Sequence, residues 1–96
     1  MDAAHPGHRT RLDGNAAGGE LFPIFGRDMT TARATCAHCA RAALVADAVA
    51  EVDADGVILL CRGCGHTLFS ALRTGGRETL TVRGLTALEW TTSGSG

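Results

Sequence analysis

Two pairs of cysteines constrain this chain more than any other feature of its sequence. Each pair has the form C-x-x-C, and 21 residues separate the two pairs. Two residues between the thiols of a pair let both sulfurs face one metal ion, and two such pairs make the closed tetrahedral cage of structural zinc sites. We therefore predict one structural Zn²⁺ with four ligands, namely Cys36, Cys39, Cys61 and Cys64.

The residues around the two pairs predict the shape of the turns that carry them. The loop between the pairs is about one residue longer than is usual for this pattern, which a β-hairpin accommodates. Gly65 follows the second pair and suits a turn whose backbone N–H groups face a sulfur, whereas Ala40 follows the first, so we expect the first turn to be less regular. We expect His38 and His66, which lie in or beside the turns, to remain outside the cage.

The sequence disfavours other uses of these cysteines but does not exclude all of them. Residues 1–7 lack the apolar core of a secretion signal. We therefore expect a cytoplasmic protein, and in that reducing compartment metal binding is more common than disulfides. A thioredoxin-like redox pair opens a helix in a βαβ unit, and no such unit is visible near either pair. A redox switch built on zinc and thiolates stays open.

The composition predicts a small domain with a thin core. The chain has 96 residues, with three Phe, one Trp and no Tyr, which is close to the size at which apolar burial alone gives marginal stability. Structural zinc contributes an apparent binding free energy of roughly 10–16 kcal/mol in small peptides, so we expect folding to require the metal. The chain has no apolar run of about 18 residues, so we expect no membrane span.

The spacing of apolar residues predicts a mostly β domain over 12–90 with a short helix near its start. We expect a flexible tail over 1–11, a helical segment over 12–25 with Asp13 as N-cap, and a flexible end over 91–96. The expected strands are 30–35, 43–52, 57–61, 66–73 and 78–83, with turns at 53–56 and 74–77. The segment 43–52 also fits a helix. We interpret it as a strand because the buried strand at 57–61 needs a neighbour.

Several apolar side chains are expected to fill the core of this domain. Those of 12–25 are predicted to cover the sheet as a lid: Leu12, Ala16, Leu21, Phe22 and Phe25. In the last hairpin, strict alternation predicts that Leu80 and Val82 point inward. The closing segment 84–90 offers further packing groups, namely Leu85, Leu88 and Trp90.

This order of strands, turns and cysteine pairs resembles a zinc ribbon, a small antiparallel sheet of hairpins. More narrowly, the chain resembles a small uncharacterised family of actinobacterial proteins, a domain of unknown function with two C-x-x-C pairs. The resemblance covers 12–88 and rests on Leu12-Asp13-Gly14-Asn15-Ala16, Phe25-Gly26, Asp28, Thr30, the two cysteine pairs and Arg83-Gly84-Leu85. The chain departs from the family at Ala40, where glycine is usual, and at Gly18-Gly19. The resemblance implies the four cysteines as ligands and no activity.

The sequence supports a binding role better than a catalytic one. A closed four-cysteine site leaves no open position at which a metal activates water. No Ser/His/Asp set, paired carboxylates or glycine-rich phosphate loop is present. We therefore expect a non-catalytic adaptor that binds an unidentified protein through the hairpins near 66–83 or through 12–25. A thiol-based redox or zinc sensor is a less favoured alternative, and the sequence leaves the oligomeric state open.

Nucleic acid is the alternative partner. Residues 61–83 hold a single acidic residue, Glu78, and four arginines, namely Arg62, Arg73, Arg77 and Arg83. Against this role, the net charge is −1 and becomes about −3 when four thiolates and Zn²⁺ are counted, whereas nucleic-acid-binding domains are usually basic. The same arginines also suit a solvated face of the hairpin.

Overall fold

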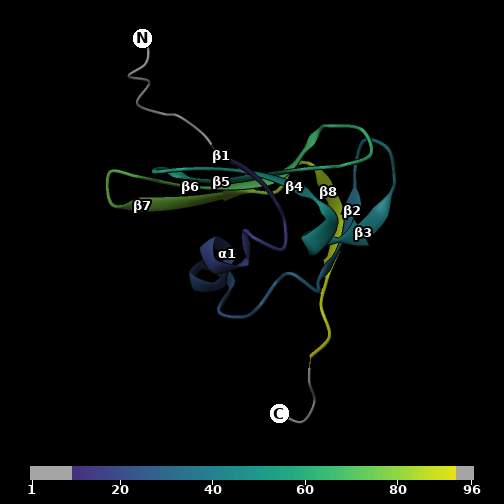
Figure 1. Ribbon diagram of the computed structural model, residues 1–96, viewed down its shortest axis with the longest axis horizontal. Helices are drawn as coiled ribbons and strands as arrows, with labels where there is room; N and C mark the ends of the chain where they lie inside the picture. Colours follow the sequence, from purple (N-terminus) through teal and green to yellow (C-terminus); the bar gives the residue numbers. More distant parts are fainter. Residues whose placement is uncertain (1–9, 93–96) are drawn as a thin grey trace.

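The computed structural model describes residues 10–92 and shows a mostly β fold (Figure 1). This part of the chain forms eight strands, one short α-helix and one 3-10 turn. In chain order these are β1 (Thr10–Asp13), α1 (Gly18–Phe25), β2 (Arg33–Cys36), β3 (Ala42–Leu44), η1 (Val45–Asp47), β4 (Val49–Asp53), β5 (Gly56–Leu60), β6 (Thr67–Thr74), β7 (Arg77–Thr81) and β8 (Leu85–Glu89). The predicted fold class, antiparallel β hairpins with one short helix, is confirmed. Within 10–92, no helix has the length and apolar character needed to cross a membrane.

The strands form two antiparallel sheets. The larger sheet has the order β1-β4-β5-β6-β7, and the smaller has the order β3-β2-β8. In the larger sheet, neighbouring strands place apolar residues in rows on one face, because directly paired residues of antiparallel strands point to the same side. One row is Leu12, Ala50, Leu59 and Phe69, and the next is Val52, Val57, Ala71 and Leu80.

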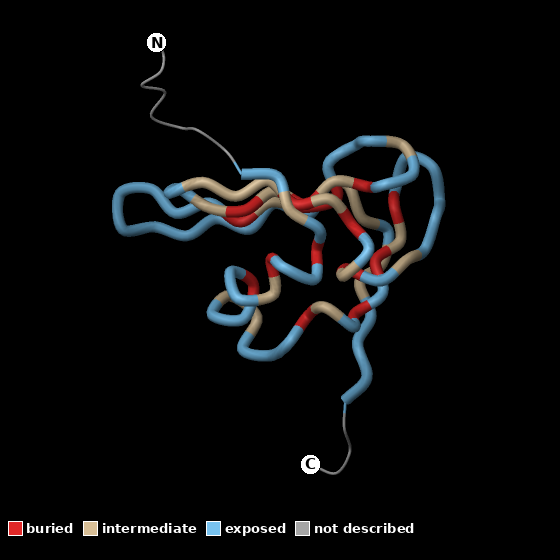
Figure 2. The backbone as a smooth tube through the Cα atoms, in the orientation of Figure 1, coloured by how far each residue is buried: buried red, intermediate tan, exposed pale blue. Residues whose placement is uncertain are grey.

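The helix α1 covers part of this apolar face. Its Leu21 is fully buried, and the ring of Phe25 meets that of Phe69 edge to face with centroids 6.0 Å apart. Gly26 ends the helix with φ 72° and donates its N–H to the carbonyl of Phe22 at 2.7 Å. Figure 2 shows buried positions in the middle of the sheet and on the side of α1 that faces it. Since an isolated helix of this length is unstable, packing on the sheet holds α1 in place.

The start of the described chain differs from the prediction. Residues 10–13 form β1 instead of ending a tail and opening a helix, because Leu12 completes an apolar row beside Ala50. Asp13 is therefore not the N-cap of α1: its carboxylate accepts the N–H of Ala16 at 2.8 Å and closes the turn that leads to a helix capped at Ala17. The rest of the predicted tail, 1–9, lies outside the described residues, as does 93–96 of the predicted flexible end.

The prediction of one strand over 43–52 is also wrong in part. This segment belongs to two strands in different sheets, β3 and β4, joined by η1. The fully buried Val45 lies at the crossing, where its N–H bonds to the carbonyl of Ala32 at 2.8 Å. The neighbour predicted for the buried strand at 57–61 is confirmed, since β4 pairs with β5. The predicted strand at 30–35 begins only at Arg33, because Asp28 accepts both the N–H and the hydroxyl of Thr30 and holds a turn there.

The last hairpin forms as predicted, but its inward residues are not buried. Gly75 and Gly76 make the turn between β6 and β7, both with positive φ. Leu80 lies on the apolar face as expected, yet 43% of it is exposed, and Val82 is 47% exposed. The reason is geometric: α1 packs on β5 and leaves β7 uncovered.

Two other packing predictions are wrong. Phe22 on α1 is 54% exposed, so the lid buries fewer side chains than expected. Trp90 follows β8 at the surface and is 41% exposed, with the guanidinium of Arg27 lying 5.3 Å from its ring centroid. The two leucines of β8, Leu85 and Leu88, are half-buried against the core as predicted.

Candidate metal centre

The structure brings the four cysteines together at one end of the molecule. Cys36 ends β2 and its partner Cys39 lies in the turn before β3, while Cys61 and Cys64 occupy the turn between β5 and β6. These two turns lie side by side in Figure 1, one from each sheet. A metal bound here therefore joins the two sheets.

The distances between the sulfurs match a tetrahedral metal site. All four Sγ atoms lie within 4.8 Å of one another. The Sγ atoms of Cys36 and Cys64 are 3.7 Å apart, as are those of Cys39 and Cys61. A metal–sulfur bond of about 2.3 Å gives a tetrahedron with edges of roughly 3.8 Å, so the cage has the size that zinc requires. The four thiols are free, and no disulfide forms among them.

Backbone hydrogen bonds build the two turns in the same way. In each turn, the residue after the second cysteine donates its N–H to the carbonyl of the first cysteine: Ala40 to Cys36 at 2.9 Å and Gly65 to Cys61 at 2.8 Å. The first cysteine of each turn also donates its own N–H to the carbonyl five residues later: Cys36 to Arg41 and Cys61 to His66. The N–H of His38 also lies 3.3 Å from the sulfur of Cys36.

The expectation of a less regular first turn is therefore wrong. Ala40 adopts the left-handed conformation with φ 66°, close to the φ of 83° at Gly65. An alanine in this region costs roughly 1–2 kcal/mol because its Cβ approaches a carbonyl oxygen. The turn keeps its geometry and stores this strain at Ala40.

Replacing Ala40 by glycine is expected to stabilise the protein. The change removes the left-handed strain but gives the unfolded chain more freedom, so the net gain is about 0.5–1 kcal/mol. Denaturant unfolding at a fixed free zinc concentration measures it. Gly65→Ala is the reverse substitution at the equivalent position of the second turn, and it should destabilise the protein by a similar amount. If both variants matched the wild type, the left-handed turns would carry no strain.

Before a metal binds, the environment separates the acidities of the thiols. The backbone N–H of Cys39 stabilises the thiolate of Cys36 against the cost of burial, and the N–H of His38 adds to this, so the pKa of Cys36 falls to about 7. For Cys64, the N–H of His66 lowers the pKa, but burial and the neighbouring thiols outweigh it and raise the pKa to about 12. Since a bound sulfur must be a thiolate, metal binding releases protons and weakens as the pH falls.

The two histidines beside the cage contact each other. The rings of His38 and His66 stack with centroids 3.5 Å apart and planes 19° apart, one from each cysteine turn. Both residues are exposed. Among the described residues, the group able to hold a metal contains the four cysteines and neither histidine. This arrangement agrees with the expectation that both histidines lie outside the cage.

A comparison with protein families gives one match. The model described as "Family of unknown function (DUF6510)" matches residues 6–93. The chain belongs to the DUF6510 family. No curated protein and no solved structure matches the chain. The expected membership of an uncharacterised family is thus confirmed, and the DUF6510 match brings no activity, ligand or partner with it.

The four arginines proposed for nucleic acid do not form one patch in this DUF6510 chain. Arg73 donates from Nε and Nη2 to one oxygen of Glu78, at 3.0 and 2.9 Å. Arg77 starts β7 at the turn of the hairpin, opposite Thr74. At the end of the molecule where the four cysteines meet, Arg62 donates to the carbonyl of Asp47 at 2.7 Å. Arg83 lines a shallow hollow there with the two stacked histidines. Nucleic-acid binding by these arginines stays a prediction.

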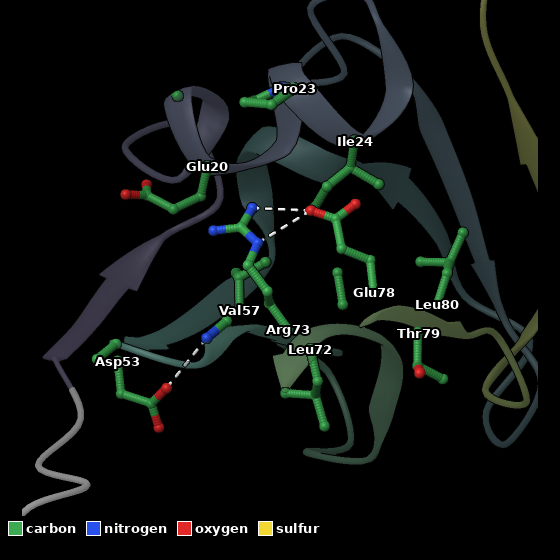
Figure 3. Close-up of a pocket in the computed structure, with 14 residues that line it drawn as sticks. Glu20, Pro23, Ile24, Asp53, Val57, Leu72, Arg73, Glu78, Thr79 and Leu80 are labelled. Carbon is green, nitrogen blue, oxygen red and sulfur yellow. Dashed lines mark hydrogen bonds and ion pairs between the residues drawn. The ribbon is translucent and has the colours of Figure 1, made fainter. Parts of the chain in front are cut away.

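Sequence reasoning missed a groove on the other side of the DUF6510 domain. It has a volume of about 560 Å³ and lies between α1 and the hairpin of β6 and β7. Figure 3 shows Glu20, Pro23 and Ile24 of α1 on one wall and Leu80 of β7 on the other. No signal in the sequence could have found it, because the groove depends on two facts that only the structure shows: α1 has eight residues, and the sheet beneath it has five strands, each about 4.8 Å from the next.

Proposed function

We propose that this protein is a non-catalytic adaptor whose fold is held by one structural Zn²⁺ on Cys36, Cys39, Cys61 and Cys64. The observation that carries the proposal is the closed cage of four sulfurs within 4.8 Å. When bound, zinc would hold the two sheets in a fixed relation, since it takes ligands from the end of each. Four thiolates satisfy a tetrahedral ion completely and leave no position for a substrate or an activated water.

The choice of zinc follows from the chemistry of the donors. Four thiolates in a tetrahedron suit zinc or iron among common metals. Zinc has no redox chemistry of its own and needs no electron-transfer partner, which fits a purely structural role. Iron in the same cage would be coloured and redox-active, so elemental analysis and the visible spectrum separate the two metals.

The role of adaptor rests on what the surface offers. Several large apolar side chains are exposed on one hairpin of a small domain, namely Leu72, Leu80 and Val82. Leu80 lies on the groove face and Leu72 on the opposite face of this hairpin, so Leu80 is the exposed apolar group beside the groove, and such a group next to a concave site is typical of a binding surface. The uncovered groove beside α1 adds a concave site to the same region.

The test combines metal content with partner recovery from the native host. We expect one zinc per chain after purification without added metal, and recovery of a defined protein by the tagged wild type. Cys61→Ser should lose both the zinc and the partner, because the surface depends on the fold that the metal holds. Val82→Thr, at an exposed position outside the cage, is the matched control for metal content and should keep its zinc. Equal recovery by wild type and Cys61→Ser would contradict the proposal.

Nucleic-acid binding at the metal end is the second candidate. Arg83 and the stacked His38 and His66 line one hollow of about 470 Å³, which combines a cation with a flat aromatic surface. Such pairs suit a stacked base beside a phosphate. A gel-shift assay with single-stranded oligonucleotides tests it, with an affinity that falls steeply with salt and drops in Arg83→Ala as the expected result. No binding at low salt removes this candidate.

A further inference from the structure

The groove between α1 and the last hairpin is open on the side of β7. This strand is the edge of the larger sheet, and all five of its residues are exposed. On an edge strand, alternate residues direct their N–H and C=O groups away from the sheet, where another strand can pair with them. The backbone of β7 therefore offers hydrogen bonds along one side of the groove.

The floor of the groove continues the apolar core toward this edge. Along one row of the sheet, exposure rises from 1% at Val57 to 6% at Ala71 and 43% at Leu80. Ile24 of α1 faces the same space and is half-buried. An additional strand beside β7 would direct every second side chain to the face of the sheet that carries Leu80, close to Ile24, where apolar groups are favoured.

The charged side chains around the groove indicate which net charge a segment that binds in it would carry. The charged side chains of its lining are three carboxylates and one guanidinium, a net charge of −2, from Glu20, Asp53, Glu78 and Arg73. Arg73 is already paired with Glu78, and Asp53 accepts backbone N–H groups of its own turn. Glu20 is exposed on the wall formed by α1 (Figure 3), and neither of the two ion pairs found within 10–92 involves it. A basic side chain on the occupant matches this wall.

A second copy of this chain does not supply that cation. Side chains alternate along β7, so Arg77 lies on the face opposite Leu80, while Glu78 lies on the groove side. Pairing two β7 strands edge to edge would bring a second Glu78, already held by its own Arg73, to the groove side. The carboxylate of Glu20 would stay unmatched. A second copy therefore matches the charges of the groove less well than a basic strand from another protein would.

We propose that the groove and the edge of β7 bind an extended, basic segment of a partner protein by strand addition. The segment carries apolar side chains at alternate positions and one lysine or arginine on the same side, which reaches Glu20. Main-chain hydrogen bonds to β7 provide affinity, and Leu80 with Glu20 provides selectivity. This inference rests on the proposed adaptor function and names its partner class.

Titration of the zinc-loaded, ¹⁵N-labelled protein with short peptides tests the proposal. The probe is a capped heptapeptide with four threonines at alternate positions and, between them in order, valine, valine and lysine. The control peptide has glutamate in place of the lysine. We expect saturable shifts of amide signals in β7 and α1, with a Kd of about 1 mM or tighter for the lysine peptide. The glutamate peptide should bind at least about fivefold more weakly, because it meets the acidic wall.

Matched variants separate the groove from the rest of the surface. Leu80→Lys should weaken binding at least about tenfold, since it removes the apolar contact and places a charge there. Thr81→Lys adds the same charge on the opposite face of β7 and should bind almost as the wild type. Glu20→Lys should reverse the preference, so that the glutamate peptide binds better than the lysine peptide.

Two outcomes would overturn the inference. One is the absence of saturable shifts with either peptide at concentrations several times higher than about 1 mM. The other is an equal loss of binding in Leu80→Lys and Thr81→Lys. A host partner that requires Cys61 but binds Leu80→Lys as tightly as the wild type would also exclude this groove while leaving the adaptor function intact. Failure of the adaptor function itself shows separately, as equal recovery by the wild type and Cys61→Ser.

Discussion

Stripping the metal from the purified protein is expected to unfold it. Of the fifteen buried apolar residues within 10–92, six are alanine and only one, Phe69, is aromatic. The core is therefore small in volume, and for a domain of this size apolar burial barely exceeds the loss of chain entropy. A structural zinc site contributes roughly 10–16 kcal/mol of apparent binding free energy, more than the whole net stability of a typical domain.

The measurement is circular dichroism and amide dispersion in NMR spectra before and after treatment with an excess of a strong chelator. We expect loss of dispersion on chelation and full recovery when one equivalent of Zn²⁺ is returned. Chelator presaturated with zinc is the control, and it should leave the spectra unchanged. A chain that loses all metal and remains compact with dispersed signals would show that its core holds the fold without the cage.

The two cysteine turns were predictable because each depends on local spacing. A C-x-x-C pair fixes its own turn, and both turns here form the same hydrogen bonds whether glycine or alanine follows. The hairpins at the end of the chain were predictable for the same reason, since Gly75 and Gly76 specify a tight turn between two alternating segments. Each of these features is decided by residues close together in the sequence.

The failed predictions depend on which distant element lies opposite. Alternation along 43–52 cannot show that the chain leaves one sheet at Val45 and enters the other at Val49. Leu12 belongs to a strand only because Ala50 lies beside it. The pattern correctly places Leu80 on the apolar face but does not show how far α1 reaches across the sheet. The same gap in coverage is what creates the groove.

The second large effect is expected at Gly84, where the chain passes from β7 to β8. Its N–H bonds to the carbonyl of Leu68 at 3.1 Å, and its carbonyl accepts the N–H of Ala37, in the first cysteine turn, at 2.8 Å. A Cβ at this position would collide with the carbonyl oxygen of Thr67 and lie 2.8 Å from the Cα of Leu68. Both obstacles are backbone atoms of β6, which cannot move without breaking the sheet.

Gly84→Ala is therefore expected to destabilise the zinc-loaded protein by roughly 3–5 kcal/mol. For a domain of this size, the melting temperature should fall by at least about 12 °C at constant free zinc. Gly19→Ala is the matched control, because its added methyl group meets nothing within 4 Å and the helix gains up to about 1 kcal/mol. Because Gly84 also holds Ala37 in the first cysteine turn, the variant should release zinc to a competing chelator faster than Gly19→Ala does. Equal melting temperatures in the two variants would mean that β8 can shift away from β6, so that the two sheets are joined by the metal cage and not by this crossing.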